Sequence, residues 1–181
     1  MLVLLDRDGV INVDRPDAVK SLDEFRFIEG SLEAIARLTH AGYRLAVVTN
    51  QSVVGRGLLS EEGLQQIHDY LVHAAAHAGG IIERVYYCPD HPDRPTQRRK
   101  PAPGMVLEAL ADFEAEAACT PMIGDALRDL QAAHAAGCPY YLVRTGVGEA
   151  ALVAGLPDEI VPRAICSNLS EAVQHWLQNP L

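Results

Sequence analysis

Short apolar runs alternate along this chain with longer segments in which apolar residues recur at helical spacing. The apolar runs are residues 2–5, 43–48, 81–88, 121–125 and 140–143. Runs of this length are typical of strands that are buried on both faces of a parallel sheet. The helical segments between and after them are residues 31–41, 61–78, 105–113, 127–136 and 170–177. Strands that alternate with helices predict an α/β fold, in which helices cover both faces of a parallel sheet.

Local signals indicate where some of these elements begin and end. Gly42 follows the first predicted helix as a stop signal, and Ser60 is a suitable N-cap for the second. Prolines and charged residues are frequent in 10–27 and 89–103, so we expect irregular loops there. We expect Gly55-Arg56-Gly57 to form a flexible loop.

The helical spacing also predicts which side chains face the core. Leu107 recurs at helical spacing with its apolar neighbours, so we expect it to face inward. His68, His73 and His77 fall on the predicted helix 61–78. Two of them are four residues apart, a metal-ligand spacing, but a solvated helix face is the preferred interpretation.

Composition limits the classes of protein to consider. The 181 residues fit one domain, residues 1–181, with 49% hydrophobic and 22% charged residues. A formal net charge of −9 argues against non-specific binding to nucleic acid. No apolar run approaches the length of a membrane span, and the first predicted strand leaves no room for a signal peptide. The four cysteines form no CxxC pair, so we expect a cytoplasmic protein with reduced thiols.

Polar residues recur where predicted strands end or in the loop beyond. They are Asp6 with Asp8, Thr49 with Asn50, Arg99 with Lys100, and Asp125 with Asp129. Because the carboxyl ends of parallel strands meet at one edge of a sheet, we expect these groups to converge. Carboxylates gathered in this way suit Mg²⁺, which takes oxygen ligands. On its spacing alone, the first of these motifs fits a solvated turn equally well.

The convergent set suits phosphoryl transfer to an aspartate. In such chemistry a carboxylate attacks phosphorus, while a metal ion and a lysine neutralise charge and a second acid handles the proton. A receiver-like signalling protein, which accepts a phosphoryl group and keeps it, is an alternative with similar residues. Receivers do not need an acid two residues after the phosphorylated one, so Asp8 counts against that alternative.

Four motifs in order carry a resemblance to a known family. They are Asp6-Arg7-Asp8-Gly9-Val10, Thr49-Asn50-Gln51-Ser52, Arg99-Lys100-Pro101 and Gly124-Asp125-Ala126-Leu127-Arg128-Asp129. Together they resemble the haloacid dehalogenase superfamily of phosphatases. That resemblance implies a Rossmann-like three-layer sandwich without a large cap domain. Further segments, including Arg56-Gly57 and Pro103-Gly104-Met105, resemble the heptose bisphosphate phosphatases and the related histidinol phosphatases. Arg56-Gly57 and Val10-Ile11-Asn12 favour the heptose branch.

The resemblance also implies catalytic roles. Asp6 would be the nucleophile that forms an aspartyl-phosphate. Asp8 would protonate the leaving alkoxide and then activate water. Thr49 and Lys100 would hold the transferring phosphoryl group, and Lys100 would also pair with Asp6.

Metal and substrate ligands follow from the same resemblance. Mg²⁺ would be held by Asp6, the backbone carbonyl of Asp8 and Asp125, with Asp129 in support. The expected substrate is a small phosphorylated sugar, preferably a heptose 1,7-bisphosphate, and we expect a monomeric enzyme with no nucleic-acid or membrane partner. The expected substrate-binding residues are Asp14, Arg15, Pro16, Asp17, Thr49, Asn50, Gln51, Ser52, Arg56, Arg99 and Lys100.

The chain departs from this pattern at two places. Relatives often carry a zinc loop just before Arg-Lys-Pro, but here Cys88 has Asp90 where a histidine is expected and Thr96 near an expected cysteine. A structural zinc site needs four nitrogen or sulfur ligands, so we do not expect zinc. Many relatives also have a lysine where this chain has Ala126, which removes a cation near the substrate. A histidinol phosphatase of the same superfamily therefore stays open as an alternative.

Overall fold

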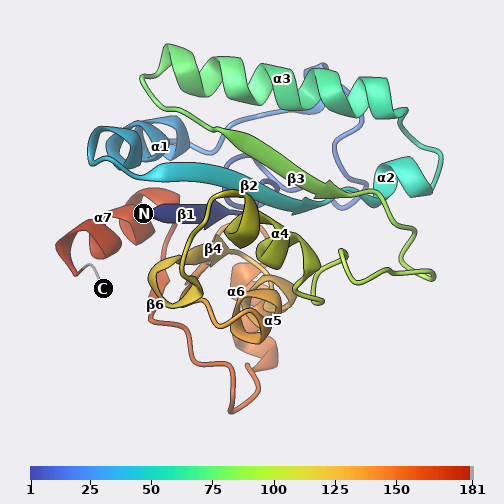
Figure 1. Cartoon of the computed structure of the whole chain (residues 1–181). Coiled ribbons are helices and arrows are strands. Elements are labelled where there is room, and N and C mark those ends of the chain that lie inside the picture. Colours follow the sequence, from blue (N-terminus) through green and yellow to red (C-terminus); the bar gives the residue numbers. More distant parts are fainter. Residues whose placement is uncertain (180–181) are drawn as a thin grey trace.

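Six parallel strands form one sheet in the order β3-β2-β1-β4-β5-β6 in the computed structural model, which describes residues 1–179 (Figure 1). The strands are β1 (Leu2–Leu5), β2 (Arg44–Asn50), β3 (Arg84–Cys88), β4 (Met122–Gly124), β5 (Tyr140–Val143) and β6 (Ala164–Cys166). The helices are α1 (Ser31–His40), α2 (Ser52–Gly55), α3 (Glu61–His77), α4 (Gly104–Asp112), α5 (Leu127–Ala135), α6 (Gly148–Ala154) and α7 (Leu169–Gln178). Two short 3-10 helices are η1 (Leu22–Glu24) and η2 (Ala117–Cys119). The predicted α/β fold with a parallel sheet is confirmed.

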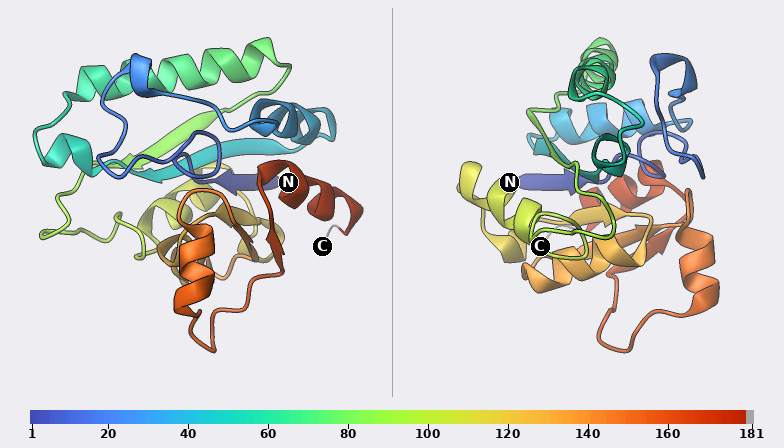
Figure 2. Two further views of the ribbon diagram at one scale, coloured as in Figure 1. Left: turned by 180° about the vertical axis from the view of Figure 1, so that it is seen from behind. Right: turned by 90° about the vertical axis from the view of Figure 1, so that its right-hand side faces the viewer.

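Strand β1 lies in the middle of the sheet and contributes to both hydrophobic cores. Val3 and Leu5 pack with α1, α3 and α7 on one face, whereas Leu2 and Leu4 pack with α4 and α5 on the other. Figure 2 shows the same separation of the helices into layers on either side of the sheet. A strand covered on both faces has no polar side, which explains its uninterrupted apolar sequence.

The direction of winding reverses between β1 and β4. From β1 the chain goes to β2 and β3 on one side, and β4, β5 and β6 follow on the other side. Ligands of open α/β sheets bind beyond the carboxyl ends of the strands at such a reversal. The Asp6 backbone N–H donates to the Ile123 carbonyl at 2.9 Å, so these two strand ends are held next to each other.

Several helix ends follow the signals in the sequence. The Ser60 hydroxyl accepts a hydrogen bond from the Gly63 N–H at 3.0 Å, as expected of an N-cap. At the start of α7 the side chain of Asn168 accepts from the Glu171 N–H in the same way. None of the described helices is long and apolar enough to cross a membrane.

Three local expectations are wrong, and two elements have no counterpart among the predicted ones. Strand β3 begins at Arg84 and not at residue 81, because the chain before it is not paired in the sheet. Gly55 ends the short helix α2, and its N–H donates to the Pro89 carbonyl at 3.0 Å, so this part of the 55–57 segment is anchored to a neighbouring loop. Leu107 is 48% exposed because α4 turns Met105 and Val106 to the core. Helix α6 and strand β6 were not predicted at all.

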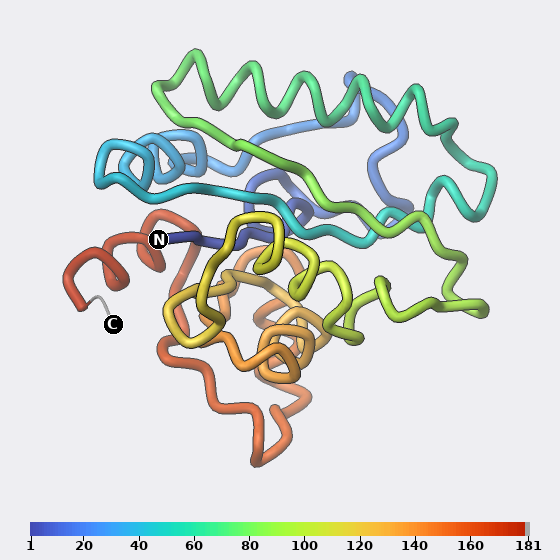
Figure 3. Tube along the Cα trace, in the orientation of Figure 1, coloured from blue at the N-terminus to red at the C-terminus, as the bar shows by residue number. Residues whose placement is uncertain are grey.

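The loop between β3 and α4 is irregular, as predicted. Figure 3 shows it running past the end of β3 and returning to α4. Because it begins at the carboxyl edge of the sheet, it carries residues 99 and 100 back to the same edge as the ends of β1 and β4.

Candidate active site

Three carboxylates meet beyond the ends of β1 and β4. Asp6 directly follows β1, Asp125 directly follows β4, and Asp129 lies in the first turn of α5. One oxygen atom from each lies within 4.8 Å of the others, and all three residues are buried. Buried charges of like sign repel one another and lack the compensation of water. The cluster therefore requires bound cations or protons.

Two glycines allow the chain to close around Asp125. Gly9 and Gly146 have positive φ angles of 82° and 60°, which favour glycine. A Cβ atom at either position would collide with the Asp125 carboxylate. Oxygen Oδ2 of Asp125 accepts a hydrogen bond from the Val147 N–H at 2.8 Å, whereas Oδ1 is buried with no hydrogen-bond partner among the described residues. A buried carboxylate oxygen without a donor is suited to coordinating a metal ion.

Lys100 supplies one positive charge to this cluster. Its Nζ lies 3.0 Å from an Asp6 oxygen and 2.7 Å from an Asp129 oxygen, and it donates to the Val48 carbonyl at 2.7 Å. Burial lowers the pKa of Lys100, but the charges of Asp129 and Asp6 outweigh this effect and raise it above its usual range. The ammonium group is therefore charged and held in place by three oxygen acceptors. The predicted pairing of Lys100 with Asp6 is present.

The end of β2 holds the backbone of Lys100 at the site. The Asn50 side chain donates to the Lys100 carbonyl at 2.9 Å and accepts from the Lys100 N–H at 3.1 Å. Thr49 is buried next to it, and its hydroxyl accepts from Gln51 Nε2 at 2.9 Å. The Thr49 hydroxyl keeps its own proton to donate, as a phosphate-binding hydroxyl requires.

Asp8 is surrounded by hydrogen-bond donors. Arg7 donates from Nη2 to both Asp8 oxygens at 3.0 and 2.9 Å, Asn12 donates at 2.8 Å and Gln51 at 2.7 Å. Burial raises the pKa of Asp8, but the charge of Arg7 and these hydrogen bonds outweigh it and lower the pKa overall. Asp8 is thus ionised and fixed beside the acid cluster.

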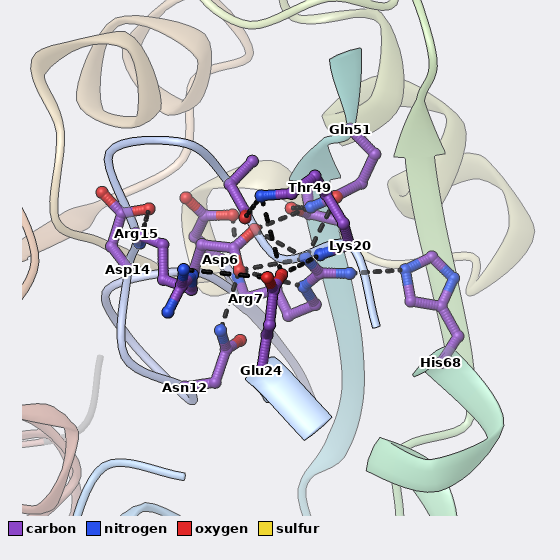
Figure 4. Close-up of polar contacts among 12 residues, drawn as sticks. Asp6, Arg7, Asn12, Asp14, Arg15, Lys20, Glu24, Thr49, Gln51 and His68 are labelled. Atoms are coloured by element: carbon purple, nitrogen blue, oxygen red, sulfur yellow. Dashed lines mark hydrogen bonds and ion pairs between the residues drawn. The ribbon is translucent and has the colours of Figure 1, made fainter. Parts of the chain in front are cut away.

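A buried histidine supports this network from α3. Arg7 is fully buried, and its Nη1 lies 3.2 Å from His68 Nε2. Figure 4 shows the two side chains facing each other. Burial, and then the charge of Arg7, lowers the pKa of His68 to about 3, so the ring is neutral and can accept this hydrogen bond. The expected solvated helix face is therefore wrong for His68, while His73 and His77 are exposed.

Sequence reasoning assigned no role to Arg7, Asn12 or His68. An arginine between two acids at the end of a buried strand is a usable signal, since a buried charge must be paired. The position of His68 gives no such signal, because it is set by how α3 packs over the sheet. The sequence assigns no role to Arg128 either.

A cavity of about 90 Å³ opens at this edge of the sheet. Its lining combines acidic, amide and hydroxyl side chains with one arginine. The lining residues are Asp6, Asp8, Asp14, Ala18, Thr49, Asn50, Gln51, Ser52, Val53 and Arg128. A larger cavity of about 510 Å³ shares Asp14 with it and is lined by Pro16 among mostly apolar residues. The first cavity lies directly at the carboxylate cluster, and the second adjoins it at Asp14.

Other expected substrate residues lie outside both cavities. Arg15 Nη2 lies 3.2 Å from Oδ1 of Asp17. The other oxygen of Asp17, Oδ2, lies 2.6 Å from Lys20 Nζ. Arg56 is exposed after the end of α2. Their roles in substrate binding stay predictions.

The loop 89–103 is held together by hydrogen bonds. Oxygen Oδ2 of Asp90 accepts from the Thr96 N–H at 2.6 Å, and the Asp90 carbonyl accepts from Arg99 Nη1 at 3.1 Å. His91 Nδ1 accepts from the Asp93 N–H at 3.2 Å. Asp90 therefore connects the middle of the loop to the guanidinium of Arg99, next to Lys100.

The acid cluster fits Mg²⁺. Burial, followed by repulsion from Asp129 and Asp6, raises the pKa of Asp125 to about 8. Burial and the charge of Asp129 likewise raise the pKa of Asp6 to about 6, although Lys100 opposes this shift. A divalent cation would relieve the same repulsion and engage Asp125 Oδ1. The backbone carbonyl of Asp8 accepts no hydrogen bond from the described residues, so it too is available as a ligand.

A buried carboxylate cluster beside a fixed lysine, at the reversal point of a parallel sheet, defines a phosphoryl-transfer hydrolase with a Rossmann-like fold. The HAD-hydrolase-like family model matches residues 97–172. A D-glycero-beta-D-manno-heptose-1,7-bisphosphate 7-phosphatase of Bordetella bronchiseptica is 43% identical over 178 residues, 98% of each chain. Its counterpart in Neisseria meningitidis serogroup A is 46% identical over 151 residues, 83% of this chain and 81% of the relative.

Solved structures agree with these sequence matches. The crystal structure of D,D-heptose 1,7-bisphosphate phosphatase from B. bronchiseptica, complexed with magnesium and phosphate, matches with a TM-score of 0.92 at 43% identity over 98% of each chain. The phosphatase from Burkholderia thailandensis matches with a TM-score of 0.74 at 42% identity, over 98% of this chain and 99% of that one. The chain belongs to the haloacid dehalogenase superfamily, in the branch of the heptose bisphosphate phosphatases.

Proposed function

We propose that this chain is a magnesium-dependent phosphatase that removes the C7 phosphate of D-glycero-D-manno-heptose 1,7-bisphosphate. The observation that carries the proposal is the match over 98% of both chains to the phosphatase crystallised with magnesium and phosphate. The carboxylate cluster, the ion pair of Lys100 with Asp6 and the adjoining cavity support the proposal.

The first half of the reaction uses Asp6 and Asp8. A carboxylate oxygen of Asp6 attacks phosphorus while the bond from phosphorus to the sugar oxygen breaks, which leaves an aspartyl-phosphate and the heptose alkoxide. Asp8 gives its proton to that alkoxide. The low pKa of Asp8 in the free protein opposes this step, but a phosphate dianion entering beside it favours the protonated form.

The second half returns the enzyme to its initial state. Asp8, now ionised, takes a proton from water, and the resulting hydroxide attacks the phosphorus of the aspartyl-phosphate. The bond from phosphorus to Asp6 breaks and inorganic phosphate leaves. Lys100 and the Thr49 hydroxyl stabilise the charge on the phosphoryl oxygens in both steps. Mg²⁺ held by Asp6, Asp125 and the Asp8 carbonyl would supply further neutralisation of that charge.

A phosphate-release screen tests the substrate. The compounds are heptose 1,7-bisphosphate, heptose 7-phosphate, other sugar phosphates and histidinol phosphate. We expect the highest kcat/KM for the heptose bisphosphate, with the C1 phosphate retained in the product. A higher kcat/KM for histidinol phosphate would contradict the heptose assignment and leave the phosphatase chemistry in place.

Replacing Arg99 by alanine should weaken the preference for the bisphosphate. Arg99 is partly buried beside Lys100, and arginine can hold a phosphate through two hydrogen bonds. We expect kcat/KM for the bisphosphate to fall roughly 10- to 100-fold, the worth of a charged hydrogen bond. Hydrolysis of a generic aryl phosphate should change much less. Arg98→Ala is the matched control, since Arg98 is exposed and pairs with Glu108 at 3.0 Å. Equal losses on both substrates would refute this role of Arg99.

Magnesium should stabilise the fold more strongly as the pH rises. The folded-state pKa values of Asp6 and Asp125, about 6 and about 8, exceed their ordinary value of 3.8. Without metal, the folded state therefore loses stability as the pH rises from near 3.8 to about 8, because these protons must be given up. Mg²⁺ replaces the protons, so its effect on the melting temperature should be larger near pH 8 than near pH 5. Thermal unfolding with Mg²⁺ and with a chelator measures this difference.

Asp125→Asn is the control for the magnesium effect. This substitution should abolish most of the stabilisation by Mg²⁺, together with the activity that depends on it. A stabilisation by Mg²⁺ that is the same at both pH values would contradict the account of the cluster.

The loop 89–103 should bind no zinc, and metal analysis of protein purified without chelator tests this. About one equivalent of bound zinc would show that the loop binds metal after all.

The proposal also covers the domain organisation, the oligomeric state and the cellular location of the protein. We expect residues 1–181 to act as one hydrolase domain, because the two hydrophobic cores lie on the two faces of one sheet. We also expect a monomer in the cytoplasm, where the free thiols of the four cysteines stay reduced. Gel filtration with light scattering tests the oligomeric state.

A further inference from the structure

Arg128 is the one positively charged residue that lines the 90 Å³ cavity, among the ten residues of that lining. It follows Leu127 in the first turn of α5, one residue before Asp129. A cation in the first turn opposes the helix dipole, which favours negative charge there. The stability of α5 therefore gives no reason for an arginine at this position.

The guanidinium of Arg128 has no polar partner in the part of the chain that the structure describes. No residue between 1 and 179 accepts a hydrogen bond from it or lies within ion-pair distance of it. The other cations near the site are engaged, since Arg7 is bound to Asp8 and Lys100 to Asp6 and Asp129. Arg128 is exposed, so its donors are free to turn toward a ligand.

The guanidinium of Arg128 is charged at the mouth of the cavity. An arginine side chain keeps its charge at every pH at which a protein is folded. With the carboxylates neutralised by Mg²⁺ and Lys100, the positive charge of Arg128 becomes available to an incoming anion. Ala126, where relatives often have a lysine, cannot provide it.

We propose that Arg128 is a substrate-binding residue that donates hydrogen bonds to the phosphoryl group undergoing transfer. This inference rests on the proposed phosphatase function. Arg128 and the nucleophile Asp6 line the same cavity, so a phosphoryl group placed for attack by Asp6 lies next to Arg128. Arg99, which lies outside this lining, serves the remote part of the substrate, so the two arginines have separable effects.

Arg128→Ala tests the inference at saturating Mg²⁺. We expect kcat/KM to fall roughly 10- to 100-fold for the heptose bisphosphate and by a similar factor for an aryl phosphate, because both present the same reacting group. The inhibition constant of inorganic phosphate should rise to a comparable extent. Arg128→Lys should recover part of each loss, since lysine keeps the charge without the fork of donors. Arg84→Ala is the matched control, as Arg84 is exposed at the opposite end of β3.

Two results would overturn the inference. One is an unchanged inhibition constant for phosphate together with a loss of kcat/KM for the bisphosphate alone. That result would show that Arg128 binds the remote phosphate. The other is a change in Mg²⁺ affinity alone, which would reduce Arg128 to a counter-charge for the carboxylates. Direct calorimetry of phosphate binding to the magnesium-loaded wild type and variants does not need turnover. It therefore decides the role of Arg128 even if the heptose bisphosphate proves to be a poor substrate.

Discussion

Replacing Asp6 by asparagine should lower kcat by roughly 10⁴- to 10⁶-fold, as the loss of a covalent nucleophile does in other enzymes. An amide nitrogen or oxygen does not displace an alkoxide from phosphorus, and the neutral side chain no longer balances the charge of Lys100. The fold should persist because asparagine has nearly the same shape and can still accept the hydrogen bond from the Arg7 N–H. Phosphate release measured with the bisphosphate and with an aryl phosphate reports the effect.

Asp69→Asn is the control for Asp6→Asn. Asp69 is an exposed carboxylate on α3, so the same chemical change there should leave turnover intact. Circular dichroism and thermal unfolding establish that the Asp6 variant is folded. Near-normal phosphate release by a folded Asp6→Asn protein would rule out Asp6 as the nucleophile.

Replacing Asp8 by asparagine should slow turnover of the sugar bisphosphate by roughly 10²- to 10⁴-fold, the usual contribution of general acid–base catalysis. The alkoxide of a sugar is a poor leaving group and needs the proton from Asp8. The phenolate of an aryl phosphate leaves without a proton. Formation of the aspartyl-phosphate should therefore stay fast in the variant, while its hydrolysis is slow. Rapid mixing with an aryl phosphate should thus reveal a burst of one phenolate per chain, followed by a slow steady rate.

The surroundings of Asp8 provide a control for this variant. Asn12→Ala removes one donor to Asp8 at 2.8 Å and keeps the carboxylate. It should reduce the rate modestly and give no burst, because the acid–base group is still present. An Asp8→Asn enzyme that hydrolyses both classes of substrate at the wild-type rate would contradict the role of Asp8.

The sequence is informative about the fold wherever burial imposes a pattern. β1 is buried on both faces, and its apolar run places it correctly at residues 2–5. α6 and β6 have no such pattern. β6 has three residues, with Ile165 43% exposed at the edge of the sheet, and α6 has Val147 and not a polar residue at its N-cap. Elements of this kind form because neighbouring parts of the fold position them, which a local pattern does not record.

The sequence likewise predicts one part of the active site and not the other. The convergence of Asp6 with Asp125 follows from two strands that end at the same edge of the sheet, so it could be predicted. The contact of Arg7 with His68 could not, because it joins residues 61 positions apart and depends on where α3 crosses the sheet. The lack of a partner for Arg128 among residues 1–179 is likewise a property of the assembled site. Asp129, the next residue in the sequence, pairs with Lys100.

The central claim is that Asp6 becomes phosphorylated during turnover. The most direct measurement is an acid quench of Asp8→Asn during reaction with an aryl phosphate, followed by borohydride reduction and peptide mass spectrometry. Borohydride cleaves an acyl phosphate and reduces that carboxyl to an alcohol, so Asp6 should be recovered as homoserine in an amount matching the burst. Recovery of unmodified Asp6 from a sample that showed the burst, or reduction at another aspartate, would contradict the account.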